Sequence, residues 1–330
     1  MSQKVLVTGG AGYIGSHVVQ QLGEAGYEVI VYDNLSTGFP WAVLSGSLIV
    51  GDLSDQGKLD EVFSEHQFDA VLHFAANIVV PESVSDPLKY YRNNTANTLS
   101  LIETCKRYDV NKFVFSSTAA VYGIPDCESV TETNHLSPIN PYGFSKMMSE
   151  QILMDYAAVS NLNYVILRYF NVAGADHHGR LGQAMPEATH LIKVACEAAL
   201  GKRSGMEIFG NDYKTPDGTC VRDYIHVEDL ASAHLDALTY LNKNNDSVTL
   251  NCGYGHGFSV KEVIDTVKNI SGKDFPVTQS GRRAGDPPCL IADNAKIKAI
   301  LGWQPRYADI DTIVKTAFSW EAKLAEFLEK

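Results

Sequence analysis

The first half of the chain alternates short apolar runs with longer stretches of helical periodicity. The apolar runs have the length of β-strands and are rich in Val, Ile and Phe. Strands that are apolar on both faces and separated by helices are typical of right-handed βαβ units, in which helices cover both faces of a parallel sheet. The runs that we expect to form this sheet are KVLVTGG, EVIVYD, SLIVGDL, DAVLHFAA, KFVFSST and NYVILRYF.

The pattern changes in the second half of the chain. Residues 173–225 are rich in Gly, Asp and His, and they contain one helical pattern, MPEATHLIKVACEAALG, followed by a long polar loop. Apolar residues then recur at helical spacing, which predicts helices at 227–242, 259–270, 293–301 and 309–328. We therefore expect this half to be smaller, richer in loops and of mixed α+β structure.

The length of 330 residues exceeds what one hydrophobic core usually supports, about 250 to 300 residues. We predict an α/β fold with a doubly wound, Rossmann-type parallel sheet in residues 1–172 and a return to that sheet at about 225–252. The smaller α+β domain is expected to occupy most of 173–330 and to bind the substrate.

Composition and charge narrow the class of protein. Hydrophobic residues make up 45% and charged residues 20% of the chain, and the formal net charge is −12, as in a soluble protein with an acidic surface. No run of Lys or Arg exceeds two residues, which argues against a nucleic-acid binder. No apolar run approaches the ~18 residues of a membrane span, and the six cysteines are scattered without metal-binding spacing. We expect a cytoplasmic protein with reduced cysteines and no membrane partner.

The histidines do not predict a metal site. His73 ends an apolar strand, and such a histidine is usually a buried, hydrogen-bonded core residue. His177 and His178 are adjacent, so we expect their side chains to point apart. No bound metal is expected.

A glycine-rich loop follows the first predicted strand. In VLVTGGAGYIGSHVVQQL, Gly9, Gly12 and Gly15 recur at every third position between an apolar strand and a helix. Glycines there allow a tight turn and let backbone N–H groups approach a pyrophosphate at the helix N-terminus. Asp33 ends the second strand, where a carboxylate binds ribose hydroxyls and repels a 2′-phosphate. The loop predicts a site that prefers NAD to NADP, with Asp52 near the adenine.

Two tyrosines stand four residues before a lysine, the spacing that places two side chains on one face of a helix. Tyr142 and Lys146 lie in NPYGFSKMMSEQI, where an Asn and a Pro suit the start of a helix. Tyr108 and Lys112 have the same spacing, but DVNK is a turn that leads into a strand. The surroundings therefore favour the first pair as the functional one.

A tyrosine that acts as a base at pH 7 needs a lowered pKa. The phenol titrates near 10, so the required shift is about three units, or about 4 kcal/mol. An ammonium ~6 Å away supplies about 2.8 kcal/mol at an effective dielectric constant of ~20. Lys146 therefore accounts for only part of the shift in Tyr142, and a positively charged nicotinamide ring is expected to supply the rest. Thr118 ends the strand KFVFSST, at the sheet edge where ligands bind.

The motifs TGGAGYIG, FSSTAAVYG and PYGFSK together resemble the extended short-chain dehydrogenase/reductase family. The stretch IFGNDYKTPDGTCVRDYIHVEDLA is similar to a more specific signature, that of members which invert C4 of UDP-sugars, and the resemblance runs from Val5 to Trp303. It implies bound NAD, UDP-glucose and UDP-galactose as substrates, and a transient 4-keto sugar. TAAVYG lacks the acidic pair with which related 4,6-dehydratases eliminate water, so no further step on the ketone is expected.

The resemblance also implies roles for individual residues. Tyr142 is expected to be the acid/base, Lys146 its partner, and Thr118 the hydroxyl that binds the oxygen at C4. Besides Tyr142 and Lys146, the residues expected to contact NAD are Gly9, Gly12, Tyr13, Ile14, Gly15, Asp33, Asn34, Asp52, Leu53, Phe74, Ala75, Asn93 and Phe170. Besides Thr118, those expected to contact the UDP-sugar are Asn171, His190, Leu191, Phe209, Arg222, Arg283 and Asp286. The two arginines suit a diphosphate, because a guanidinium binds two oxygens at once.

Some positions depart from the family pattern or leave the substrate open. Thr118 stands where some members have Ser, which keeps the hydroxyl, and His190 where some have Asn, so it can still donate one hydrogen bond. Ile78 stands where a Lys reaches the NAD phosphates in some members. Leu290 occupies the position that gates the sugar pocket, and its medium size leaves UDP-N-acetylhexosamines or UDP-hexuronic acids as alternative substrates.

One alternative belongs to a different class of protein, and one expectation concerns assembly. An NAD-sensing regulator with the same fold would be expected to lose Thr118, Tyr142 and Lys146, and all three are present. Apolar helix faces at 90–105 and 142–158 predict a homodimer held by a helix bundle, as in relatives.

Overall fold

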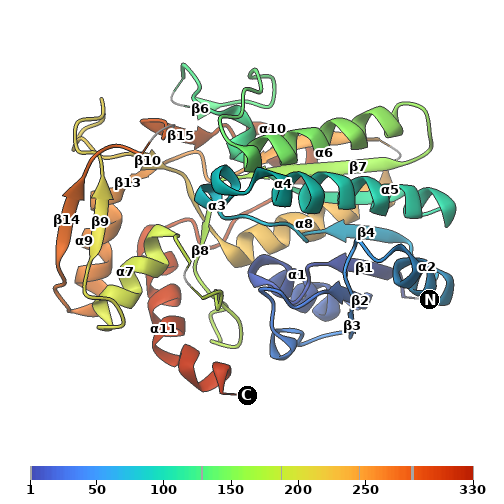
Figure 1. Ribbon diagram of the computed structural model, residues 1–330, viewed down its shortest axis with the longest axis horizontal. Helices are drawn as coiled ribbons and strands as arrows, with labels where there is room; N and C mark the ends of the chain where they lie inside the picture. Colours follow the sequence, from blue (N-terminus) through green and yellow to red (C-terminus); the bar gives the residue numbers. More distant parts are fainter. Residues whose placement is uncertain (1, 128, 187, 245, 284–285, 330) are drawn as a thin grey trace.

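A large parallel sheet organises the protein. The computed structural model describes residues 2–127, 129–186, 188–244, 246–283 and 286–329. The sheet has seven strands in the order β12-β7-β5-β4-β1-β2-β3 and occupies the right-hand part of Figure 1. The order steps outward from β1 in both directions, which confirms the predicted doubly wound arrangement. Its strands are β1 (Lys4–Thr8), β2 (Glu28–Asp33), β3 (Ser47–Val50), β4 (Ala70–His73), β5 (Lys112–Thr118), β7 (Asn163–Tyr169) and β12 (Val248–Cys252).

Helices cover both faces of this sheet and alternate with short strands and loops in the second half of the chain. In chain order, the α-helices are α1 (Tyr13–Glu24), α2 (Gln56–Glu65), α3 (Val80–Ser85), α4 (Pro87–Tyr90), α5 (Asn97–Arg107), α6 (Pro141–Ala157), α7 (Leu191–Ala199), α8 (Val227–Lys243), α9 (Val260–Ser271), α10 (Ala295–Leu301) and α11 (Ile310–Leu328). The short 3₁₀ segments η1 (Pro40–Ala42) and η3 (Ala119–Tyr122) and the π-helical segment η2 (Tyr91–Ala96) connect them. Within the described residues, no helix is long and apolar enough to cross a bilayer.

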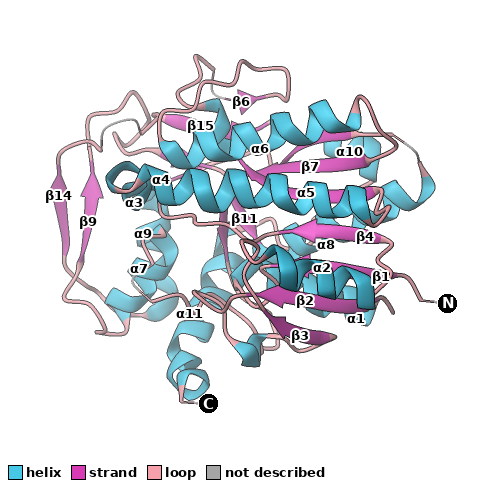
Figure 2. Ribbon diagram, turned by 45° about the vertical axis from the view of Figure 1, so that its right-hand side comes forward, coloured by secondary structure: helices cyan, strands magenta, loops and turns pink. Residues whose placement is uncertain are grey.

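The two faces of the sheet carry separate apolar cores, because successive residues of a strand point to opposite faces. Val5 and Val7 of β1 face the layer of α1 and α8 and share its apolar cluster. Leu6, between them, faces the layer of α2, α5 and α6. Figure 2 shows α5 and α6 side by side over the second face. These layers hold the strand ends in fixed positions, so residues that follow the strands become neighbours at one edge.

The residues that the structure describes also form three smaller sheets. A four-stranded sheet has the order β13-β10-β15-β6, and two-stranded sheets pair β11 with β8 and β14 with β9. Together with α7, α9 and α11, β9 and β14 form the left-hand part of Figure 1. The strands are β6 (Ser129–Val130), β8 (Asn171–Ala173), β9 (Met206–Phe209), β10 (Val221–Arg222), β11 (Tyr224–His226), β13 (Phe258–Ser259), β14 (Val277–Ser280) and β15 (Cys289–Ala292).

The predicted elements are found with one substantial difference. All six predicted strands are present, β12 is the predicted return to the sheet, and α8 to α11 begin and end within two residues of the predicted helices. The helical pattern in MPEATHLIKVACEAALG gives a shorter helix than its length indicates, because α7 begins only at Leu191. His190 before it is extended, with φ −71° and ψ 130°, so the helix does not continue back through this residue. Glu187 lies outside the described residues.

Candidate active site

The start of α6 fixes the position of the tyrosine that the sequence singles out. The Asn140 side chain accepts a hydrogen bond from the Gly143 N–H at 2.9 Å, and Pro141 occupies the first helical position. The helix therefore begins at the phenol, and Lys146 follows Tyr142 by one turn on the same face.

The second Tyr–Lys pair is not a site. Tyr108 directly follows α5, and its hydroxyl donates to the Asp60 carbonyl at 3.1 Å. Lys112 begins β5 and donates to the Asn242 side chain at 2.8 Å. The two side chains have separate partners, as the turn between them predicts.

Tyr142 is buried beside the end of β5. Its side chain is 7% exposed, and Thr118, which ends β5, is 8% exposed. The Thr118 hydroxyl is a hydrogen-bond partner of the phenol. Burial raises the pKa of Tyr142, and the hydrogen bond from Thr118 offsets this only in part. The rings of Tyr90 and Tyr142 pack edge to face, with 6.5 Å between their centroids. The protein alone therefore keeps this tyrosine protonated at neutral pH.

Lys146 is buried against the same strand. Its Nζ donates to the Ser116 carbonyl at 2.7 Å and lies 4.6 Å from the centre of the Phe115 ring. Burial lowers the pKa of Lys146 to about 7, although the negative charge of Glu150 acts in the opposite direction. The lysine is therefore poised between its two charge states near neutral pH, which the spacing in the sequence did not indicate.

A buried ion pair lies one turn beyond Lys146 on α6. Arg168 of β7 binds both oxygens of Glu150, with Nη2 to Oε2 at 2.6 Å and Nε to Oε1 at 3.0 Å. The two side chains are 5% and 0% exposed. The Ser117 hydroxyl of β5 also donates to Glu150. These contacts join α6 to β5 and β7, and so they fix the separation between Tyr142 and the strand that carries Thr118.

Asn94 is a further buried polar residue of the site that the sequence pattern does not single out. Its amide donates to the Asn77 carbonyl at 2.9 Å and to the Ser145 hydroxyl at 3.0 Å, and its oxygen accepts the Asn77 N–H at 2.8 Å. Asn94 lies in η2, a π-helical turn of the kind often found at functional sites. The adjacent pair of asparagines at 93 and 94, within an otherwise helical pattern, is the one signal in the sequence.

The glycine loop has the shape that a dinucleotide requires. Gly9 has φ +73°, a conformation that favours glycine, and a Cβ there would lie 2.6 Å from the Ala75 nitrogen. The helix α1 begins directly after the loop, so its first N–H groups face outward from the turn. The Asp33 carboxylate accepts the N–H groups of Ala11 at 2.9 Å and Leu35 at 2.8 Å, which holds it beside the loop. The residues present thus fit a pyrophosphate and a ribose.

The other residues expected to contact the cofactor lie around this loop and the neighbouring strand ends. The Asp52 side chain accepts from the Asn34 side chain at 2.7 Å, and Leu53 beside it is buried. Tyr13 donates to the Gly174 carbonyl at 2.7 Å. Of the remaining ones, Phe170 is buried, and those that are partly exposed are Ile14, Phe74, Ala75 and Asn93.

The residues expected to bind the UDP moiety form two groups. In the first, the Arg283 guanidinium lies 3.8 Å from the centre of the Phe209 ring. The Arg222 guanidinium is 3.5 Å from an Asp286 carboxylate oxygen, and the Asp286 N–H donates to the Arg283 carbonyl at 3.3 Å. The structure thus brings two arginines, an aromatic ring and a carboxylate together from two distant parts of the chain.

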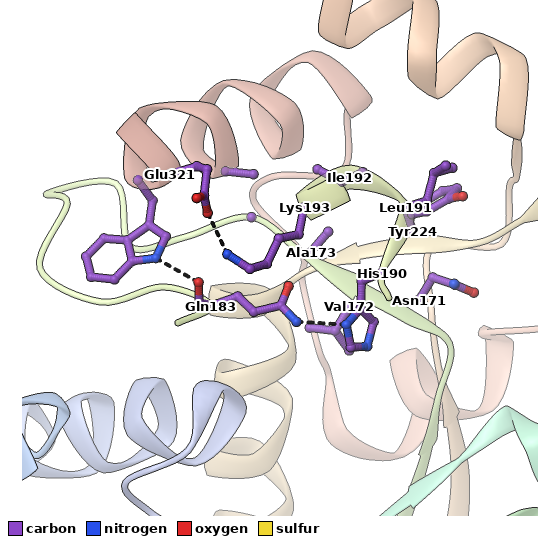
Figure 3. A pocket seen from close by; sticks show the side chains of 13 residues that line it. Asn171, Val172, Ala173, Gln183, His190, Leu191, Ile192, Lys193, Tyr224 and Glu321 are labelled. Carbon is purple, nitrogen blue, oxygen red and sulfur yellow. Dashed lines mark hydrogen bonds and ion pairs between the residues drawn. The ribbon is translucent and has the colours of Figure 1, made fainter. Parts of the chain in front are cut away.

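The second group lines a small cavity of about 30 Å³, drawn in Figure 3. Asn171, His190 and Leu191 lie on its wall, and the His190 ring is 2.7 Å from the Gln183 amide nitrogen. Burial lowers the pKa of His190, so the imidazole is neutral at pH 7. Figure 3 also shows the buried ion pair of Lys193 with Glu321 of α11, 2.6 Å apart, which anchors the start of α7.

Two expectations about histidines have different outcomes. His73 is buried, with its ring nitrogens 2.6 Å from the Thr8 hydroxyl and 2.8 Å from the Thr98 hydroxyl, as predicted for a core residue. The prediction that His177 and His178 point apart is wrong, because their ring centroids are 3.9 Å apart. The two residues lie in a loop rather than a strand, so adjacent side chains are not forced to opposite faces.

The sheet, the glycine loop and the acid at the end of β2 define a dinucleotide-binding fold, and the buried Thr, Tyr and Lys at the same sheet edge add the side chains of an enzyme site. Comparison with known proteins identifies the family. The chain belongs to the NAD dependent epimerase/dehydratase family, whose model matches residues 5–253.

Similar proteins cover nearly the whole chain. A UDP-glucose 4-epimerase from Azospirillum brasilense is 55% identical over 98% of this chain and 94% of its own length. The UDP-glucose 4-epimerase of Brucella ovis, solved in complex with NAD, is 46% identical with a TM-score of 0.94, over 96% of this chain and 98% of that one. The UDP-Glc/GlcNAc 4-epimerase from Campylobacter jejuni is 53% identical with a TM-score of 0.87, over 98% of this chain and 100% of that one.

Proposed function

We propose that the protein interconverts UDP-glucose and UDP-galactose by NAD-dependent epimerisation at C4, through a transient 4-keto sugar. The observation that carries this proposal is the buried Thr118, Tyr142 and Lys146 set at the sheet edge that also holds the glycine loop. It is supported by likeness over nearly the whole chain to curated UDP-glucose 4-epimerases. The isomerase activity, the NAD cofactor and the UDP-sugar substrate follow from the same comparisons.

The cofactor site is proposed to consist of the glycine loop and the strand ends around it. The N-terminus of α1 and the loop backbone hold the pyrophosphate, and Asp33 binds the adenosine ribose. Bound NAD supplies a hydride acceptor and donor for C4 of the sugar. The other proposed contacts are Gly9, Gly12, Tyr13, Ile14, Gly15, Asn34, Asp52, Leu53, Phe74, Ala75, Asn93, Tyr142, Lys146 and Phe170.

The protein's own side chains are proposed to move the proton. Tyr142 removes the proton from the 4-hydroxyl and returns it after the sugar has turned, while Thr118 holds the C4 oxygen by a hydrogen bond. Because burial raises the pKa of the phenol, the base form requires nearby positive charge. Lys146 supplies part of that charge, and Glu150 helps to keep it protonated.

Epimerisation needs the nucleotide to be held while the sugar turns. We propose that Arg222 and Arg283 bind the diphosphate, since a guanidinium suits two phosphate oxygens and the protein as a whole is acidic. The Phe209 ring is proposed as an aromatic contact of the uracil, beside Arg283, whose guanidinium lies 3.8 Å from the centre of that ring. The remaining proposed contacts are Asn171, His190, Leu191 and Asp286.

A second candidate substrate class is UDP-N-acetylhexosamines. Leu290 is 9% exposed and packs in one apolar cluster with Phe170 and Tyr122, so a side chain of medium size closes this wall of the site. The similar Campylobacter jejuni protein is described as a UDP-Glc/GlcNAc 4-epimerase. UDP-hexuronic acids and a non-catalytic NAD-sensing role have no such support.

Assembly and organisation complete the proposal. Apolar side chains gather on the outer surface of α3 to α6 and include Val84, Leu88, Leu99, Phe144 and Met148, with exposures from 37% to 69%. A second copy of the chain that covers this surface would form a homodimer. We also propose a cytoplasmic location, and a division into a cofactor domain (1–172 with 225–252) and a substrate domain (mainly 173–330).

The experiment that tests the function is incubation of the purified protein with UDP-galactose and, separately, UDP-N-acetylgalactosamine, without added NAD, followed by chromatography of the products. We expect UDP-glucose from the first, and no product from the Tyr142→Phe variant. Conversion of neither substrate by protein that retains NAD would refute the proposal. Conversion of both would show that Leu290 admits the N-acetyl group.

A further inference from the structure

Three potential metal ligands converge on the side of the molecule formed by α1, the start of α8 and the loop after β8. One ligand atom each from Asp176, His177 and Glu228 lies within 4.8 Å of the other two. Asp176 and Glu228 are 4% and 8% exposed, and His177 closes the group from the outside. His177 Nδ1 is 3.2 Å from each Glu228 oxygen, and its backbone N–H donates to the same carboxylate at 3.3 Å.

The two carboxylates are not equally compensated. Arg180 binds both oxygens of Asp176, at 2.8 and 3.0 Å, and so balances its charge. Among the ion pairs of the described residues, Glu228 has only the imidazole of His177. Glu228 is buried and lies beside the second carboxylate, so its negative charge is only partly compensated. A second positive charge at this point would therefore relieve a real electrostatic cost.

An independent observation comes from His17 of α1, which lines the same cavity of about 380 Å³. His17 is 2% exposed, and its Nδ1 lies 2.8 Å from the Tyr13 carbonyl, which can only accept. Its Nε2 has no hydrogen-bond partner of good geometry among the described residues, and its contact with the backbone of Leu181 is a weak one. A buried neutral ring whose Nδ1 donates to that carbonyl carries a lone pair on Nε2.

A buried histidine with an unused nitrogen can also be a simple packing feature, and the chain offers a comparison. His234 likewise has an unpartnered Nε2, but its ring packs on Phe74, with 4.7 Å between the centroids, and it does not line this cavity. His17 differs because its neighbours in the cavity are two carboxylates and a second imidazole.

We propose that Asp176, His177 and Glu228 form a binding site for a divalent transition-metal ion of the Zn²⁺ class. One imidazole nitrogen and two carboxylates suit such an ion, whereas Mg²⁺ and Ca²⁺ prefer oxygen ligands alone. The ion would replace the proton between His177 Nδ1 and Glu228. A water bound to it would satisfy the lone pair of His17, and Arg180 would remain as the outer partner of Asp176.

Such a site would be structural. It would tie the loop after β8 to the first turn of α8 and to α1, which begins at the glycine loop. The Tyr13 hydroxyl already joins α1 to the loop after β8 through the Gly174 carbonyl. None of the three proposed ligands belongs to the Thr118, Tyr142 and Lys146 set, so the inference does not depend on the proposed function.

The test is titration of Zn²⁺ and of Co²⁺ alone into chelator-treated protein that carries no histidine tag. We expect one ion per chain by calorimetry and a higher melting temperature with Zn²⁺. His177→Ala and Glu228→Gln should each weaken binding by about tenfold or more. The matched control His178→Ala removes the neighbouring imidazole, which is outside the group, and should change affinity by less than about twofold. Circular dichroism of each variant confirms that it is folded.

Several results would overturn the proposal. One is the absence of stoichiometric Zn²⁺ binding by the wild-type protein. Another is an equal loss with His178→Ala, which would indicate a surface histidine pair. A thiolate charge-transfer band with Co²⁺ would place the ion on cysteine, and equal affinity for Mg²⁺ would exclude a nitrogen ligand. Unchanged affinity for Zn²⁺ in a folded His177→Ala variant would also overturn the proposal.

Discussion

Replacement of Lys146 by methionine isolates the contribution of its ammonium to the tyrosine beside it. The variant keeps a long apolar stem against the Phe115 ring but removes the charge. Tyr142 and Lys146 are one turn apart on α6, where Cβ atoms are about 5 to 6 Å apart, and a charge acting across about 6 Å at an effective dielectric constant of about 20 is worth about 2.8 kcal/mol. That energy corresponds to about two pKa units of Tyr142, or about a hundredfold in rate. Because burial lowers the pKa of Lys146 to about 7, the effect should be largest at or below pH 7.

Two assays on the NAD complex check this prediction. Turnover of UDP-galactose at saturating substrate and NAD should fall about a hundredfold in Lys146→Met. Ultraviolet titration of the phenolate, with Tyr142→Phe as the blank, should show the pKa of Tyr142 about two units higher than in the wild type. A loss smaller than about fivefold with a normal phenolate titration would refute the electrostatic role. A loss that excess NAD restores would assign Lys146 to cofactor binding instead.

Three further predictions concern stability and assembly. The pKa of Lys146 is lower in the folded than in the unfolded protein, so unfolding takes up a proton above pH 7. In urea denaturation between pH 7 and 9, the free energy of unfolding of the wild type should therefore rise by up to about 1.4 kcal/mol per pH unit relative to that of Lys146→Met. The same pH dependence in both proteins would contradict this prediction. Arg168→Met leaves the Glu150 carboxylate buried without its ion-pair partner and should lower the free energy of unfolding by about 3 to 5 kcal/mol. The double variant Arg168→Met/Glu150→Leu should recover most of this loss, and equal stability of the single and double variants would exclude a costly unpaired charge. Leu99→Glu should convert a dimer to a monomer in sedimentation velocity, whereas Val159→Glu, 83% exposed and just beyond α6, should not; identical sedimentation of both would place the interface elsewhere.

The large sheet and its helices were predictable because local patterns determine them. The central strands are apolar on both faces, and helices cover both faces in the structure. Val5 and Leu6, adjacent in β1, belong to the apolar cores on opposite faces of the sheet. The glycine loop and Asp33 could be placed because a strand end and a helix start define their positions. The start of α6 at Pro141 could also be predicted, because the cap consists of Asn140 and the N–H of Gly143, three residues later.

Contacts between distant parts of the chain could not be predicted from spacing. The partner of Lys146 is a carbonyl of β5, 30 residues away, and the pair of Glu150 with Arg168 requires α6 to cross β7. The depth of burial sets the pKa of Lys146, and depth is a property of the packed structure rather than of a motif. In the same way, His177 contacts Glu228, which is 51 residues away in the sequence, and the adjacent pair His177 and His178 does not reveal this contact.

The central claim is that one protein-bound cofactor oxidises C4 and then reduces it again, with Tyr142 moving the proton. The most direct measurement is conversion of UDP-galactose that carries deuterium at C4, in ordinary water, followed by mass spectrometry of the UDP-glucose formed. The product should retain the deuterium at C4, and Tyr142→Phe should form almost none of it. Loss of the label to solvent, or normal conversion by Tyr142→Phe, would contradict it.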